Sequence, residues 1–126
     1  MPVILETREN GRVQYFRFVD PWRIPDLTSL FPVDNDYRNS VSFVVHTLAD
    51  MTETEIVPPG VMSARHGVPV HEHPRSGLFV MAGANNFHKV MTTMVLRSLR
   101  NTRNQFFSTV DEAWAYLRKW IAEHPE

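Results

Sequence analysis

The segment Ile56-Val57-Pro58-Pro59-Gly60 lies where the sequence predicts that a strand ends and a helix begins. Proline fixes the backbone φ angle and lacks the amide hydrogen that a helix interior must donate, so Pro58 and Pro59 can only stand in a first helical turn. We expect this helix to continue to about Arg65 and to end before Gly67. Because no side chain of the segment can attack a substrate or transfer a proton, the junction predicts a structural or contact role.

The run of residues 41–48 before this junction is apolar and β-branched, with few polar interruptions. Such a run is typical of a strand buried on both faces of a parallel sheet, and we interpret it as the central strand. His46 lies inside it and is expected to be a hydrogen-bonded core histidine rather than a catalyst. Residues 52–55 then form a predicted solvated loop that leads to Pro58.

An N-terminal β-hairpin is predicted from Asn10-Gly11, which separates the apolar residues 3–5 from the apolar and aromatic residues 13–18. Asn-Gly between two such runs is the strongest short hairpin signal. Both faces of the second run carry aromatic side chains, which indicates a strand inside a sheet rather than a solvated edge.

A short helix is predicted after this hairpin, because apolar residues recur about one helical turn apart over residues 24–31. We expect the helix to stop before Pro32, since proline does not fit a helix interior. The polar residues 34–40 are then expected to form a loop.

The second half of the chain continues the alternation of strands and helices. Residues 78–82 form a continuous apolar strand, after which either Asn85 or Asn86 can cap the next helix. A short strand follows at residues 105–107, and a capping-box pattern at residues 108–112 predicts the start of a last helix. The core-facing stripe of that helix is expected to contain Val110, Ala113, Trp114, Leu117 and Ile121.

The order of predicted elements is thus β, β, α, β, α, β, α, β, α. This alternation predicts one α/β domain spanning residues 1–126, with an N-terminal hairpin followed by βα units and right-handed crossovers. We expect a mostly parallel sheet of about five strands and about four helices.

Three segments carry a resemblance to a known family, namely residues 44–60, 77–85 and 107–113. They are similar, in order and spacing, to the third strand and its junction, the fourth strand and its turn, and the final strand and helix start of the STAS and SpoIIAA-like family. The resemblance extends from about Val13 to Leu117. It implies a SpoIIAA-like fold and a non-enzymatic module that binds another protein until a junction serine is phosphorylated.

The chain departs from the family at that switch. The family's junction often reads Ile-Asp-Ser-Ser-Gly, whereas Pro58 and Pro59 stand here where the serines would be. Proline has no hydroxyl, so phosphorylation at these two positions is chemically impossible. Ser63 is the nearest serine, but one turn into the helix its hydroxyl points elsewhere, and we expect an ordinary small helical residue there.

The leading functional hypothesis is a STAS-like interaction or regulatory domain that lacks the serine switch. Its expected partner-binding residues are Pro58, Pro59, Gly60, Ser63, Asn85 and Asn86. The alternative is a domain that binds a lipid or nucleotide in a cleft between sheet and helices. Self-association stays open, because Trp22 and Trp120 either form an exposed contact or cover the core.

The composition bounds the class of partner. Thirteen basic and 14 acidic residues among 126 give a formal net charge of -1, so no global positive field exists to hold nucleic acid. The chain contains no cysteine, which excludes disulfides and thiolate sites and weakly favours a reducing compartment. Apolar runs fall far short of the roughly 20 residues that a membrane helix needs, and we expect a cytoplasmic protein without membrane contact.

Histidines form the densest cluster of potential ligands, since His66, His71 and His73 lie close in sequence. Their spacing matches no known metal signature, so we predict loop histidines without a metal. No phosphate-binding loop, nucleophile elbow or paired-carboxylate pattern is found, and we expect neither a cofactor nor a catalytic residue. An enzyme using His46, His71 or His73 ranks last. Core packing rather than a cofactor pocket is expected from Met81, Met91, Met94, Phe87 and Trp114.

Overall fold

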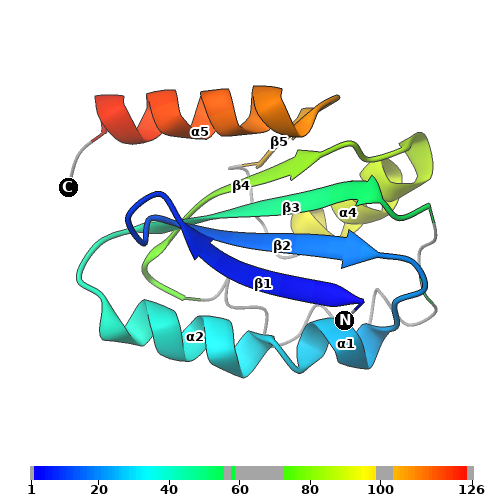
Figure 1. Ribbon diagram of the computed structural model, residues 1–126, viewed down its shortest axis with the longest axis horizontal. Coiled ribbons are helices and arrows are strands. Elements are labelled where there is room, and N and C mark those ends of the chain that lie inside the picture. The colour runs from blue at the N-terminus through cyan, green and yellow to red at the C-terminus, as the bar shows by residue number, and fades with distance from the viewer. Residues whose placement is uncertain (1, 56–57, 59–72, 99–103, 125–126) are drawn as a thin grey trace.

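A computed structural model describes residues 2–55, 58, 73–98 and 104–124 and contains a five-stranded sheet between helices on both faces (Figure 1). The strands lie side by side in chain order, with β1 antiparallel to β2 and every later pair parallel. The α/β class and the mostly parallel five-stranded sheet are therefore confirmed. The strands are β1 (Val3–Arg8), β2 (Val13–Val19), β3 (Val45–Glu53), β4 (Ser76–Ala82) and β5 (Asn104–Phe107).

The predicted N-terminal hairpin is confirmed, and its turn needs a glycine. Glu9, Asn10 and Gly11 all have positive φ angles, with Gly11 at 87°. The Tyr37 hydroxyl donates a hydrogen bond of 2.6 Å to the Gly11 carbonyl, and a Cβ atom on Gly11 would lie 2.5 Å from that hydroxyl oxygen. Both the backbone conformation and the space beside it thus favour glycine.

Two helices follow the hairpin, α1 (Ile24–Thr28) and α2 (Phe31–Ser40). The prediction of a loop over residues 34–40 is wrong, because Pro32 begins a helix instead of ending one. It stands in the first turn of α2, where a backbone amide needs no partner within the helix. The polar side chains Asp34 and Arg38 are buried beneath the sheet, so α2 shows no apolar periodicity.

The central strand is displaced from its predicted place. β3 is the middle strand of the sheet, as expected, but it begins at Val45 rather than at residue 41 and continues to Glu53. The expected solvated loop over residues 52–55 is therefore wrong for its first half, and Thr54 beyond the strand is buried. β3 extends past its apolar run because the polar Asp50 finds hydrogen-bond donors inside the fold.

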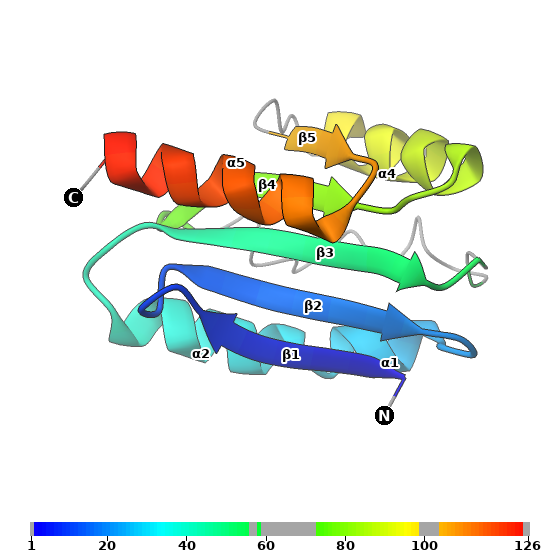
Figure 2. The same ribbon diagram turned by 45° about the horizontal axis from the view of Figure 1, so that its top comes forward.

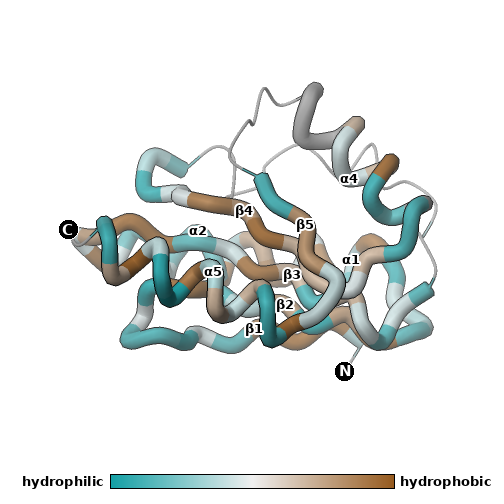
Figure 3. The backbone as a smooth tube through the Cα atoms, turned by 90° about the horizontal axis from the view of Figure 1, so that it is seen from above, coloured by the Kyte–Doolittle hydropathy of each residue, from teal (hydrophilic) through white to brown (hydrophobic). Residues whose placement is uncertain are grey.

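The sheet buries a different cluster of side chains on each face. Helix α5 (Val110–Glu123) covers one face and buries its predicted stripe against residues of β2, β3 and β4 (Figure 2). The opposite face packs against α1, and the Thr92 hydroxyl of α4 (Asn86–Ser98) contacts the Met81 sulfur on that same face. β4 supplies hydrophobic residues to both clusters (Figure 3).

The predicted core residues divide between these faces. Trp114 lies in the cluster under α5 and Met81 in the opposite cluster, which confirms that both pack in the core. The prediction for Met94 is wrong, because half of this residue is exposed on the outer side of α4. Trp22 is buried and Trp120 half-buried, and each packs against one of the two clusters.

Both predicted helix caps are present. Thr109 and Glu112 form a reciprocal capping box at the start of α5. Asn85 accepts a hydrogen bond of 2.8 Å from the His88 amide at the start of α4. The helix predicted after Pro59 lies outside the described residues, so the count of about four helices stays a prediction. Within the described part of the chain, every helix is too short or too polar to span a bilayer.

A buried ion pair joins α2 to the sheet. Arg38 is fully buried, and its Nε donates a hydrogen bond of 2.9 Å to Asp34, four residues earlier. The remaining guanidinium hydrogen bonds go to the Val45 carbonyl, the Ser76 hydroxyl and the Thr47 hydroxyl, at 2.7 to 3.0 Å. One cation thereby fixes the helix against two neighbouring strands.

Candidate functional site

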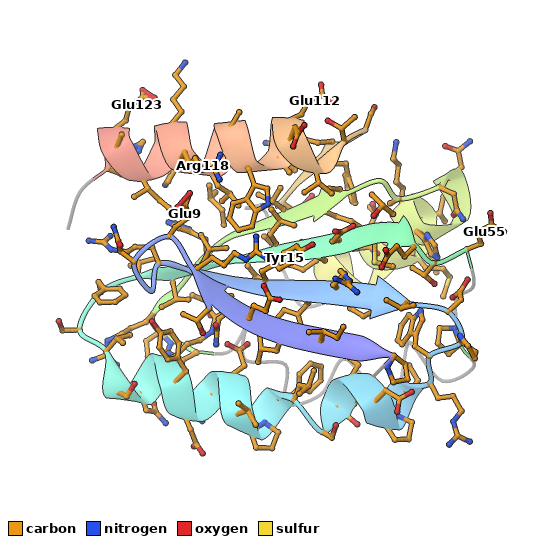
Figure 4. The ribbon with its side chains drawn as sticks, in the orientation of Figure 1. Glu9, Tyr15, Glu55, Glu112, Arg118 and Glu123 are labelled. Carbon is orange, nitrogen blue, oxygen red and sulfur yellow. The ribbon has the colours of Figure 1, made fainter. Side chains whose placement is uncertain are left out.

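The loops that follow the parallel strands β2, β3 and β4 meet at one edge of the sheet. We call the loops of residues 20–23, 54–55 and 83–86 the carboxyl edge. Glu55 lies at this edge, whereas Glu9 and Glu123 lie at the opposite end of the molecule (Figure 4). Most side chains of the three loops are exposed, including Asp20, Glu55, Asn85 and Asn86.

The loop after β2 holds the loop after β3. The Asp20 carboxylate accepts hydrogen bonds from the Thr54 hydroxyl and, at 2.8 Å, from the Glu55 amide. The Thr54 hydroxyl oxygen in turn accepts a hydrogen bond of 2.9 Å from the indole nitrogen of Trp22. Because Trp22 and Thr54 are buried, these bonds fix the backbone that leads to the junction.

The turn after β4 contacts the same segment. The Asn85 side-chain amide donates a hydrogen bond of 3.3 Å to the Glu55 carbonyl while its oxygen caps α4. Gly83 has a φ of 72° and donates its amide to the Phe107 carbonyl at 2.9 Å. A Cβ atom on Gly83 would lie 2.5 Å from the Thr52 methyl carbon, so this turn also requires glycine.

The structure describes three of the six predicted partner-binding residues, Pro58, Asn85 and Asn86. Asn85 and Asn86 are exposed, and Asn85 contacts the segment that precedes the junction. Pro58 is buried. Pro59, Gly60 and Ser63 lie outside the described residues. Sequence reasoning missed Asp20, Trp22 and Thr54, because no local pattern signals hydrogen bonds between residues 32 to 35 positions apart.

A buried carboxylate lies in the sheet near this edge. Asp50 accepts a hydrogen bond of 2.5 Å from the Tyr15 hydroxyl, and its other oxygen accepts from the amide and hydroxyl of Thr52. Burial, followed by the hydrogen bond to Asp50 and its negative charge, raises the pKa of the Tyr15 phenol far above its usual value. Tyr15 points from β2 into the space between the sheet and α5 (Figure 4). The Tyr15 and Asp50 pair thus connects β2 to β3 inside the fold.

His46 is a hydrogen-bonded core histidine, as predicted. Its Nδ1 accepts a hydrogen bond of 2.9 Å from the Leu78 amide, which requires that this nitrogen carry no proton. A Cβ atom on Gly77 would lie 2.3 Å from the same nitrogen. Glycine at position 77 therefore leaves room for the His46 ring between β3 and β4.

In His73, as in His46, Nδ1 accepts a hydrogen bond and therefore carries no proton, but the partners are different residues. Its Nδ1 accepts a hydrogen bond of 3.0 Å from the Arg75 amide, and its Nε2 lies 2.7 Å from the Asn39 side-chain oxygen and donates to it. His73 lies outside the helices and strands, as the prediction of loop histidines requires, and its side chain is buried. His66 and His71 lie outside the described residues, and within the described ones no three His, Cys, Asp or Glu side chains gather as metal ligands.

We expect His73 to make the fold less stable in mild acid. Burial lowers the pKa of His73 below the usual 6.5, as do the charges of Arg38 and Arg75, while Asp34 opposes them. A proton therefore binds the unfolded chain more tightly, and the contribution of His73 to stability is complete above about pH 6.5 and is lost as the pH falls toward the folded pKa.

Urea unfolding of the wild type and of His73→Asn between pH 5 and 8 measures this contribution, because an asparagine oxygen can accept the Arg75 amide without titrating. The free energy of unfolding should fall less steeply toward pH 5 in the variant. Equal slopes for both proteins would contradict the prediction.

Comparison of the chain with protein-family models, curated proteins and solved structures finds no match. The resemblance to the STAS and SpoIIAA-like family thus stays a prediction carried by the motifs. The carboxyl edge itself, with its fixed backbone and exposed polar rim, is the basis for a functional proposal.

Proposed function

We propose that the chain is a non-enzymatic STAS-like interaction or regulatory domain that binds a protein partner through the carboxyl edge. The N-terminal hairpin and the mostly parallel five-stranded sheet support the proposal, because the sequence predicts the same α/β arrangement. The loops of the proposed surface come from three successive strands, so a partner would contact residues far apart in sequence.

The hydrogen bond between the Asn85 side chain and the Glu55 carbonyl carries the proposal. It connects the turn after β4 to the segment before the junction, while Asp20 fixes that segment from the other side. A surface whose backbone is fixed before binding loses less conformational entropy when a partner docks. Exposed side chains on a fixed backbone therefore favour specific protein recognition.

The hydrogen bonds of the buried polar residues support the non-enzymatic part of the proposal. Tyr15 and Asp50 are hydrogen-bonded to each other and buried. His46 and His73 each use Nδ1 to accept a backbone amide, so neither Nδ1 is available as a base.

Binding at this edge should be independent of phosphorylation at the junction. Pro58 and Pro59 have no hydroxyl. Thr54 is the hydroxyl residue nearest to them in the described chain, but it is buried between Trp22 and Asp20. A kinase could not reach this hydroxyl without breaking both hydrogen bonds. We therefore propose a constitutive interaction or one controlled at another site.

Added positive charge at the carboxyl edge should weaken partner binding. We expect Glu55→Arg combined with Asn86→Arg to raise the Kd for the partner by about tenfold or more, because a mismatched charge in an interface is costly. Both side chains are exposed, so the fold should persist. The measurement is affinity capture from native lysate at several salt concentrations, followed by titration of the captured protein.

Lys119→Glu on the exposed side of α5 is the matched control and should bind like the wild type. Capture of the same proteins by all three chains would show that the carboxyl edge is not the contact surface. Capture of no specific protein by the wild type would count against an interaction domain.

A further inference from the structure

The peptide group between Asn10 and Gly11, in the turn of the hairpin, is held less firmly than the one after it. Its N–H and C=O make no hydrogen bond to a described residue, and neither does the exposed Asn10 side chain. The next peptide group is held on both sides, since the Gly11 carbonyl accepts from the Tyr37 hydroxyl and the Arg12 amide donates to the Glu9 carbonyl at 3.1 Å. The peptide group between Asn10 and Gly11 can therefore rotate without losing a hydrogen bond to the described chain.

The residue types at this turn bring two groups together that react with each other. Asn10 is the only asparagine of the chain that a glycine follows. Because glycine has no Cβ atom, no side chain shields the Gly11 nitrogen or restricts its approach to the Asn10 carboxamide. Asparagine belongs to the thermolabile residues that proteins of hyperthermophiles contain less often. The turn thus combines a reactive amide, an unshielded nitrogen and a peptide group that can rotate.

We propose that Asn10 is a site of spontaneous deamidation in the folded protein. The Gly11 nitrogen attacks the Cγ atom of Asn10, the bond from Cγ to the side-chain nitrogen breaks, and ammonia leaves with the proton of the Gly11 amide. Solvent water then adds to either carbonyl carbon of the cyclic imide and opens the ring. The product is aspartate, or isoaspartate where the main chain continues through the former side-chain carbon. The site is separate from the carboxyl edge, because Glu9 and Glu55 lie at opposite ends of the molecule (Figure 4).

Two other asparagines are held in a way that opposes this reaction. Asn85 uses both ends of its side chain, which donates to the Glu55 carbonyl and accepts from the His88 amide. The Asn39 side-chain oxygen lies 2.7 Å from His73 Nε2, and Asn39 belongs to the last turn of α2, where the helical backbone fixes the following peptide group. Asn39 and Asn85 are both exposed, so they are matched references within the same chain.

Deamidation would change the contacts of the hairpin turn. The new carboxylate is charged at neutral pH and lies next to Glu9, which pairs with Arg118 of α5. Isoaspartate also lengthens the main chain in a turn where residues 9–11 all have positive φ angles. This displaces the Gly11 carbonyl from the Tyr37 hydroxyl that donates to it. We expect the isoaspartate form to melt at a lower temperature than Asn10→Asp, which carries the same charge on an unaltered main chain.

Incubation of the purified full chain at mildly alkaline pH, below its melting temperature, tests the proposal. Peptide mapping by mass spectrometry, in water enriched in heavy oxygen, identifies each asparagine whose amide has become a labelled carboxylate. Deamidation should be about tenfold or more faster at Asn10 than at Asn39 or Asn85, and should give isoaspartate as well as aspartate. Asn10→Gln should abolish the reaction at this position, because glutamine has to close a larger ring.

The same chain unfolded in urea gives the rate that the local sequence sets without the fold. An Asn10 side chain that stays intact in the folded protein but deamidates in urea would overturn the proposal, because the turn would then protect it. Equal rates at Asn10, Asn39 and Asn85 in the folded protein would overturn it as well.

Discussion

Asp34→Ala is expected to lower the free energy of unfolding by about 3–5 kcal/mol, the usual effect of removing one partner of a buried ion pair. Arg38 is fully buried, and without the carboxylate its charge would face a carbonyl and two hydroxyl groups among the described residues. The desolvated cation, rather than the lost bond alone, causes the large effect. Urea denaturation at pH 7 measures it.

Glu6→Ala provides the comparison, because Glu6 pairs with Arg8 in an ion pair whose side chains are both more than 40% exposed. That substitution should lower stability by about 1 kcal/mol at most. Replacing both buried partners, with Asp34→Leu and Arg38→Met, should recover part of the loss, since no buried charge remains. Equal effects of Asp34→Ala and Glu6→Ala would show that the buried pair does not hold α2 on the sheet.

Leu48→Ala is expected to lower the free energy of unfolding by about 2–5 kcal/mol. Leu48 is fully buried in the middle of the central strand, in one cluster with Val13 and Tyr15 of β2, Val80 of β4 and Trp114 of α5. Truncation leaves a cavity lined by three strands and a helix, which cannot all collapse into it. The same urea experiment gives the value.

Leu48→Met keeps nearly the same volume and should cost less than about 1.5 kcal/mol. Val33→Ala, at an exposed position, should change stability by no more than about 0.5 kcal/mol in dilute protein. If Leu48→Ala were as mild as Val33→Ala, the cluster under α5 would not be the tightly packed core that we describe.

Short sequence patterns predicted the elements whose stabilising contacts lie within a few residues. The Asn10-Gly11 turn and the capping box of Thr109 and Glu112 involve residues only a few positions apart, and both are present. The apolar run of β4 was likewise recognisable, because a strand buried on both faces needs hydrophobic residues at every position.

Helix α2 was missed because its inward side chains are polar. Hydrophobic periodicity assumes that the buried side of a helix is apolar, whereas Asp34 and Arg38 neutralise each other beneath the sheet. The predicted end of β3 was too early for the same reason. Asp50 is polar and suggests a loop, but in the fold it accepts a hydrogen bond from Tyr15, 35 positions away.

The candidate site was predicted in part for a similar reason. Asn85 and Asn86 follow from the helix start that they flank. Asp20, Trp22 and Thr54, which fix the carboxyl edge, interact only after β2 and β3 have paired. Such contacts depend on the register of two strands, which the sequence of either strand alone does not specify.

The order of the strands has a consequence for how the chain folds. Each strand pairs only with its predecessor and its successor in sequence, so every βα unit can add to an edge that already exists as the chain emerges from the ribosome. The face that carries Leu48 and Val80 differs, because its described cover is α5, near the C-terminus. Until residues 110–123 are synthesised, that apolar face lacks its helix and is open to chaperones.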